Sequence, residues 1–169
     1  MQSASPQTPI GDTLPESSPT LLLCYDGSDR AAHAIAVAAQ LFPGASASVV
    51  HVWEPLEHVV ARYAVLAPYL GENIAEADAS VEQQSSTIAA EGVKLAAEAG
   101  LVASAHSATL KETVWQAVIA AAEEVNADLI ITGTRSLHGA RELLAGTLSH
   151  SLLQHSAVPL LAIPTPGDK

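Results

Sequence analysis

The feature that most constrains this chain is a regular alternation of short apolar runs with longer stretches of helical periodicity. Five apolar runs are predicted to be strands, at 21–25, 47–53, 101–109, 127–132 and 158–163. Helices are predicted between them, at about 29–41, 72–99 and 112–125, with a last helix ending near residue 155. Such alternation is typical of βαβ units, so it predicts a parallel sheet with helices on its faces.

The polarity of each run predicts the place of its strand in the sheet. Strands one and four are almost wholly apolar, which is typical of central strands covered on both faces. The third strand is interrupted by Ser104 and His106, and the fifth is bracketed by Pro159 and Pro164, so both are predicted to be edge strands. With right-handed crossovers the expected strand order is 3-2-1-4-5, in a Rossmann-like three-layer α/β sandwich.

Length and local composition set the expected domain organisation. A chain of 169 residues is long enough for one domain with a sizeable core and too short for two ordinary ones. Residues 1–19 are rich in Pro, Ser and Thr and hold hardly any bulky apolar side chain. Because such a segment cannot repay the entropy cost of folding, we expect a disordered tail over 1–19 and a single domain over 20–169.

The charge balance limits the classes of partner. Seven Lys and Arg residues stand against 18 Asp and Glu residues, for a formal net charge of −11. A surface this acidic repels phosphate backbones and anionic headgroups, so binding to nucleic acid or membranes is not expected. The chain shows neither a signal-peptide pattern nor an apolar run of membrane-spanning length, so a cytoplasmic location is expected. Its histidines and single cysteine lack the spacing of a protein-only metal site.

Two segments are predicted to meet at the crevice between the central strands, where sheets of this order bind ligands. The first is the exit of strand one, where Asp26 follows the apolar run. Its carboxylate can accept hydrogen bonds from ribose hydroxyls or from an adenine amino group. The same residue type also caps helices, and the sequence alone leaves both roles open for Asp26.

The second segment follows strand four and contains several glycines. Gly133 allows the backbone to turn sharply and to approach a ligand. If the last helix starts at Gly146, its free N–H groups and the Thr147 hydroxyl form an anion site. Arg135 and Arg141 lie in the same segment, and their placement in so acidic a chain favours a bound phosphate. The alternative is that Gly146 is simply tolerated inside a longer helix.

Several short motifs together resemble one known family over about residues 19–164. These motifs are Tyr25-Asp26-Gly27-Ser28, His51-Val52, Ala127-Asp128-Leu129-Ile130, the stretch from Gly133 to Thr147, and Val158-Pro159-Leu160-Leu161. The chain resembles the universal stress protein family on these residues. Its ATP-binding members carry Gly, two residues, Gly, nine residues, and then Gly followed by Ser or Thr. Here Gly133, Gly146 and Thr147 meet that spacing.

The resemblance implies a role for each matching residue. Asp26 would hold the adenosine end of the nucleotide, and the backbone of Val52 would contact the adenine. The ribose and phosphates would be held by residues of the glycine-bearing segment and the helix that follows, namely Gly133, Arg135, Gly146, Thr147 and Leu148. Ser136 stands where the family pattern has its second glycine, and its side chain either crowds the phosphates or donates a hydrogen bond to them.

The function implied by the resemblance is a stress-response regulatory or protective module that binds ATP, with Mg²⁺ carried in by the phosphates. The sequence has no Walker A motif, no nucleophile elbow and no evident general base, so catalysis is not expected. The alternative is a family member that binds no nucleotide and works only through protein contacts, which Ser136 favours. Strand five, Val158–Ile163, is an apolar edge that predicts a homodimer, and the resemblance also implies pairing of the two fifth strands.

Overall fold

A computed structural model describes residues 18–56, 58–59, 74–110, 112–134 and 148–165. The strands are β1 (Leu21–Cys24), β2 (Ser46–Trp53), β3 (Val102–Thr109), β4 (Leu129–Thr134) and β5 (Leu160–Pro164). The helices are α1 (Asp29–Leu41), α4 (Ile74–Glu98), α5 (Val114–Glu124) and α6 (Leu148–His155). Strands and helices alternate along the chain as the apolar pattern predicts.

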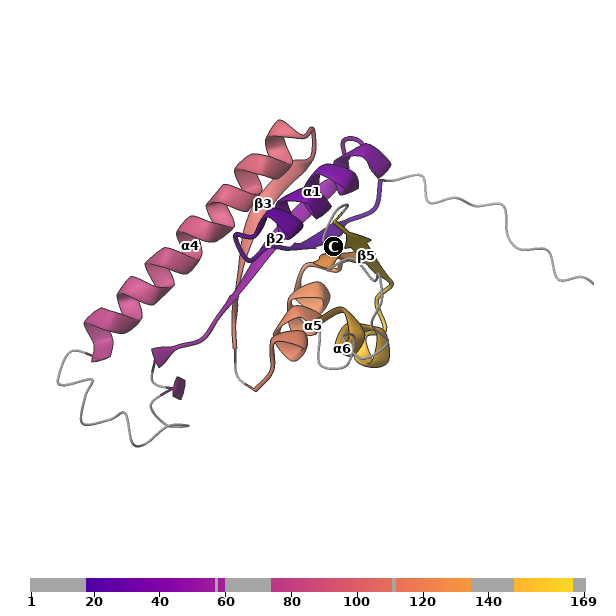
Figure 1. The fold of residues 1–169 in the computed structure, drawn as a ribbon. Coiled ribbons are helices and arrows are strands. Elements are labelled where there is room, and N and C mark those ends of the chain that lie inside the picture. The colour runs from indigo at the N-terminus through magenta and orange to yellow at the C-terminus, as the bar shows by residue number, and fades with distance from the viewer. Residues whose placement is uncertain (1–17, 57, 60–73, 111, 135–147, 166–169) are drawn as a thin grey trace, which may run out of the picture.

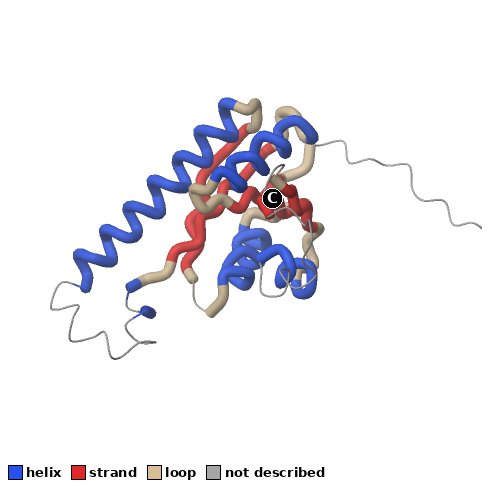
Figure 2. Tube along the Cα trace, in the orientation of Figure 1, coloured by secondary structure: helices blue, strands red, loops and turns tan. Residues whose placement is uncertain are grey.

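The strands form a single parallel sheet of order β3-β2-β1-β4-β5, which confirms the predicted topology. Helices α1 and α4 cover one face, and α5 and α6 cover the other (Figure 1). Figure 2 shows the three layers in the same orientation, with the strands between the two helical layers. Strands β1 and β4 are central and β3 and β5 are edges, as their composition predicts.

Alternation along each strand divides the core into two apolar layers. Leu21, Leu23 and Tyr25 of the first strand and its exit point toward α1 and α4. Leu22, between them, points toward α5 and α6. Strand β1 is almost fully buried because both of its faces are covered, and successive side chains of a strand point to opposite faces.

The bounds of the strands differ from the sequence prediction by one or two residues, and the differences are largest in β4 and β5. Strand β4 continues to Thr134 rather than ending at residue 132, because Gly133 and Thr134 pair with Ile163 and Pro164 of β5. Strand β5 begins at residue 160 rather than 158. The hydroxyl of Ser156 accepts the Val158 N–H at 3.0 Å and donates to the Val158 carbonyl at 2.9 Å, so this turn holds those groups outside the ladder.

Local sequence signals account for the helix ends. The side chain of Ser28 accepts the Ala31 N–H and caps α1, and the side chain of Thr113 accepts the Gln116 N–H and caps α5. Gly100, with φ +99°, follows α4 in a conformation that L-residues with side chains rarely adopt. Among the residues that the structure describes, no helix combines the length and the apolar character needed to cross a bilayer.

Candidate functional site

The carboxyl ends of β1, β2 and β4 lie side by side at one end of the sheet. Register pairs Cys24 with Val50 and Leu23 with Ile131, so these three strands run in step toward the same edge. Pairing continues past the end of β1, because the Tyr25 N–H donates to the Val50 carbonyl at 2.9 Å. The exits of β1 and β4, between which the sequence predicts a ligand crevice, therefore lie next to each other.

Asp26 lies at the exit of β1, with its side chain exposed. Its Oδ1 accepts the Ser28 N–H at 3.0 Å, across a turn in which Gly27 has φ +80°. Of the two roles that the sequence left open for Asp26, the capping role belongs to Ser28. The Asp26 carboxylate holds the turn before the helix and remains open to solvent.

The charge of Asp26 is favoured by its surroundings. Partial burial acts to raise the pKa of Asp26, but three hydrogen bonds and one cation outweigh it and lower that pKa. The hydrogen bonds come from the hydroxyl and N–H of Ser28 and from the N–H of Asp26 itself, and the cation is Arg30. The site therefore presents an ionised carboxylate at neutral pH, which is a strong acceptor for hydroxyl or amino hydrogens.

Gly133 lies inside β4, and the sharp turn expected at this residue is not what the structure shows. The first turn of α1 crosses directly over it. A Cβ on Gly133 would be 2.5 Å from the carbonyl oxygen of Arg30 and 2.7 Å from its carbonyl carbon. Residue 133 therefore needs to be glycine because a helix backbone packs against it.

The first turn of α6 is held against the end of β4. Leu148, the first residue of α6, is half-buried in the apolar layer beneath α5 and α6. Ser149 and Thr132 are buried, and their hydroxyl oxygens are 3.0 Å apart in a hydrogen bond between helix and strand. This bond holds the first described turn of α6 against β4.

Four of the predicted phosphate ligands, Arg135, Ser136, Gly146 and Thr147, lie outside the residues that the structure describes. The choice between a helix start at Gly146 and a longer helix through it also falls there. Of the predicted site residues, the structure describes Asp26, Val52, Gly133 and Leu148.

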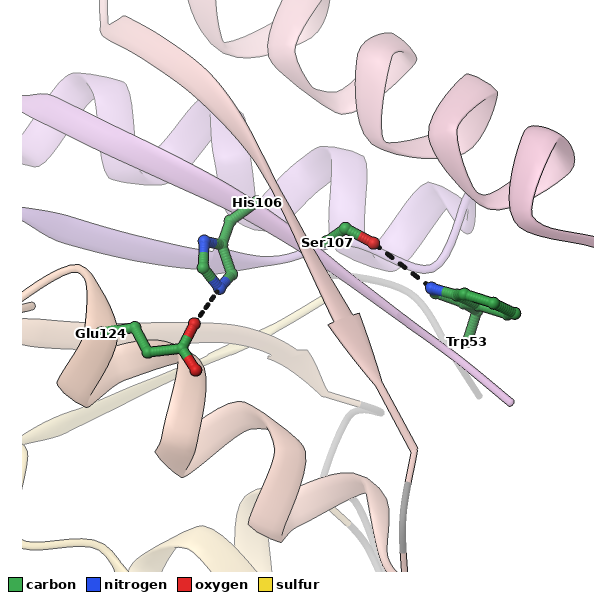
Figure 3. Close-up of polar contacts among 4 residues, drawn as sticks. All are labelled: Trp53, His106, Ser107 and Glu124. Carbon is green, nitrogen blue, oxygen red and sulfur yellow. Dashed lines mark hydrogen bonds and ion pairs between the residues drawn. The ribbon is translucent and has the colours of Figure 1, made fainter. Parts of the chain in front are cut away.

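The exit of β2 forms the third side of the site. Val52 is half-buried against the apolar layer under α5 and α6, so its side chain points to the same face as Cys24. The neighbouring Trp53 donates from its indole N–H to the Ser107 hydroxyl of β3 at 3.2 Å (Figure 3). His51 donates from Nδ1 to the carbonyl oxygen of Tyr25 at 2.9 Å, which joins the exits of β1 and β2. Sequence reasoning missed this contact, because a histidine in a strand does not reveal its partner.

The Cys24 thiol lies beside the site and is unsuited to nucleophilic chemistry. Burial, and to a lesser extent the charge of Asp26, raises the pKa of Cys24 to about 12. The thiol is therefore protonated at neutral pH. Its role is that of a small apolar side chain packed against the layer under α5 and α6.

A separate hollow of about 500 Å³ lies between β3 and α5, at the edge of the sheet away from β4. Small side chains such as Ala117 and Ala120 line it together with polar groups. His106 of β3 and Glu124 of α5 contact each other at it, with Nε2 and Oε2 3.1 Å apart (Figure 3). Within the described ranges, no three His, Cys, Asp or Glu side chains come together in a way that would hold a metal ion.

Comparison with known proteins identifies the family. Residues 19–164 match the model of the universal stress protein family, which covers nearly all of the described part of the chain. The chain belongs to the universal stress protein family. A curated relative from Thermus aquaticus, the universal stress protein in the QAH/OAS sulfhydrylase 3′ region, is 32% identical over 148 residues, which are 85% of this chain and 97% of that protein.

Solved structures show the same fold at lower sequence identity. A universal stress protein from Burkholderia pseudomallei is 19% identical, has a TM-score of 0.63, and is matched over 90% of this chain and 100% of its own. A family member from Arabidopsis thaliana, solved with AMP bound, is 13% identical with a TM-score of 0.59. That match covers 89% of this chain and 94% of the plant protein. At these identities the likeness concerns the fold.

Proposed function

We propose that this universal stress protein binds an adenine nucleotide, ATP with Mg²⁺, in the crevice between the exits of β1 and β4. The observation that carries the proposal is the ionised, solvent-exposed Asp26 at one wall of the crevice, opposite a helix start held to β4 by the Thr132–Ser149 bond. Asp26 would accept hydrogen bonds from the nucleoside. The start of α6 and the segment before it would supply N–H donors to the phosphates.

The chemistry of the crevice suits binding rather than turnover. A carboxylate that already holds the Ser28 N–H serves as a hydrogen-bond acceptor, and the protonated Cys24 thiol is no nucleophile. We therefore propose that the nucleotide acts as a regulatory ligand. By binding one conformation or assembly of the protein better than another, it would shift the balance between them. The AMP bound to the Arabidopsis relative supports an adenine nucleotide as the ligand class.

Thermal unfolding with and without Mg²⁺–ATP tests the proposal. Saturation at one hundred times the dissociation constant adds about 2.7 kcal/mol of stability. For a domain of this size that is roughly 5–10 °C in melting temperature. Mg²⁺ alone and Mg²⁺–GTP are the ligand controls, and AMP and ADP report how much the outer phosphates contribute.

Asp26→Asn removes one charge at the crevice and should greatly reduce the shift. Asp29→Asn makes the same charge change in the exposed first turn of α1 and should leave the shift intact. A wild-type protein that shows no shift at millimolar nucleotide contradicts the proposal. That result would favour the second candidate, a protein acting only through protein contacts, for which Ser136 in place of the family glycine is the supporting observation.

We also propose that two copies pair through their β5 strands. Among the described strands, β5 pairs with β4 alone, and Leu160, Leu161 and Ala162 remain partly exposed in the single chain. An apolar edge strand of this kind is a template for pairing with another chain. Leu161→Lys should therefore give a monomer in light scattering at micromolar concentration. Leu153→Lys, at an exposed leucine of α6, adds the same charge and should leave a dimer. A monomeric wild-type protein would refute the pairing.

A further inference from the structure

The ring of Tyr25, the residue before Asp26, packs against the backbone of α4 at Gly92. Only 4% of the surface of Tyr25 is exposed. A Cβ placed on Gly92 of α4 would be 2.8 Å from Cδ1 and 2.9 Å from Cγ of the Tyr25 ring, and 2.7 Å from Cγ1 of Val49. Contacts that short do not occur between real atoms, so the ring occupies a place that exists only because residue 92 has no side chain.

Three further ties hold Tyr25. Its N–H donates to the Val50 carbonyl at 2.9 Å, and its carbonyl oxygen accepts from Nδ1 of His51, also at 2.9 Å. The exposed carboxylate of Glu91, next to Gly92 in α4, interacts with the hydroxyl of Tyr25. Burial, followed by the negative charge of Glu91, raises the pKa of Tyr25, so the hydroxyl keeps its proton and can donate to that carboxylate.

The side chain of Asp26 makes only local contacts within the described part of the chain. It is exposed, and the hydrogen bonds to its carboxylate come from the N–H of Asp26 itself and from Ser28, two residues along the same turn. The position of Asp26 relative to the crevice therefore depends on Tyr25, the residue that precedes it in the chain. A hydrogen bond weakens steeply when its geometry changes, so a small displacement of Tyr25 would weaken the hydrogen bonds between Asp26 and a ligand.

We propose that Tyr25 is a positioning residue of the nucleotide site and that α4, through Gly92 and Glu91, sets where Asp26 stands. This inference rests on the nucleotide binding proposed above. It adds that α4, which contacts the face of the sheet opposite α5 and α6, controls nucleotide affinity without touching the ligand. Glu91 is exposed on that helix, so the affinity can be changed from the protein surface.

Nucleotide affinity of the Gly92→Ala variant is the first test. The added methyl displaces the Tyr25 ring, and we expect the dissociation constant for Mg²⁺–ATP to rise about tenfold, as when one hydrogen bond to a charged group is weakened. Ala96→Gly, at a fully buried position one turn further along α4, is the matched control. It should lower the melting temperature while keeping the dissociation constant within about twofold of wild type, because it weakens the helix without touching Tyr25.

A double-mutant cycle with Asp26→Asn separates positioning from general loss of packing. If Tyr25 acts through Asp26, Gly92→Ala should change the affinity less than about twofold once Asp26 is replaced. An equal effect of Gly92→Ala in both backgrounds would overturn the inference. So would a Gly92→Ala protein that binds like wild type.

Two milder variants keep the test available if Gly92→Ala does not fold. Tyr25→Phe and Glu91→Gln each leave the aromatic ring in place. They change only the interaction between the hydroxyl of residue 25 and the carboxylate of residue 91. Each should raise the dissociation constant about threefold, and the double variant should add little, because both act on one bond. Unchanged affinity in both overturns the inference while leaving nucleotide binding standing. A wild-type protein that binds no nucleotide overturns the proposed function as well, so the two failures are distinct.

Discussion

Replacing Gly133 by alanine is expected to destabilise the protein even when no nucleotide is present. The new methyl would sit 2.5 Å from the Arg30 carbonyl oxygen, about half an ångström inside the 3.0 Å limit that real Cβ atoms keep. It would also lie 2.7 Å from the carbonyl carbon of Arg30 and 3.1 Å from the Ala31 nitrogen. All three are backbone atoms of the first turn of α1, so no side chain can rotate away to make room.

The cost follows from what must move. Helix α1 packs on β4 and β5, and a shift of its first turn disturbs the Ser28 cap and the apolar contacts of Ala31 and Ala34. Overpacking of a tight contact typically costs 1–3 kcal/mol, and a backbone clash belongs at the upper end, so we expect about 2–3 kcal/mol. For a domain of this size that is a fall of roughly 5–10 °C in melting temperature.

Urea denaturation of the nucleotide-free protein, followed by circular dichroism, measures this loss. Gly44→Ala is the comparison, because a Cβ at Gly44 meets nothing within 4 Å and only its φ of +74° is unfavourable. That strain should cost about 1–2 kcal/mol, less than the clash at Gly133. A Gly133→Ala protein as stable as wild type would refute the close approach of α1. The glycine would then be needed only for the ligand, as the sequence alone suggested.

Three further predictions concern single groups of the site. Thr132→Val leaves the buried Ser149 hydroxyl without its partner and should cost about 1–3 kcal/mol in urea denaturation, whereas adding Ser149→Ala should recover part of that loss. The pKa of Asp26 is lower in the folded than in the unfolded protein, so its contribution to stability is present at neutral pH and is lost as the pH falls through the folded pKa. Unfolding free energies of wild type and Asp26→Asn measured from pH 2.5 to 7 should therefore converge at the acid end, and curves that stay parallel would contradict this. Cys24, with a pKa raised to about 12, should react with a thiol reagent at pH 8 only after unfolding, so rapid labelling of the native protein would show that the thiol is more accessible than its burial implies.

The sequence by itself determined the architecture and several local details. The contrast between the apolar first and fourth strands and the interrupted third strand indicated the order of the sheet. It did so because the composition of a strand depends on whether one or both of its faces are buried. Ser28, which caps α1, is a local signal of this kind, because capping depends on a residue and its next three neighbours. The placement of Asp26 at a strand exit beside the crevice followed from the same local pattern.

Tertiary structure alone decided which partner each of these residues meets. Gly133 faces the backbone of a helix that begins about a hundred residues earlier, and Tyr25 rests on Gly92 of a distant helix. The bond from Thr132 to Ser149 and the end of β4 opposite β5 likewise depend on chain segments brought together only by folding. Periodicity records which face of an element is buried, but it carries no information on which atoms cover that face. The reason a glycine stands at 133 or at 92 therefore becomes visible only in the packed molecule.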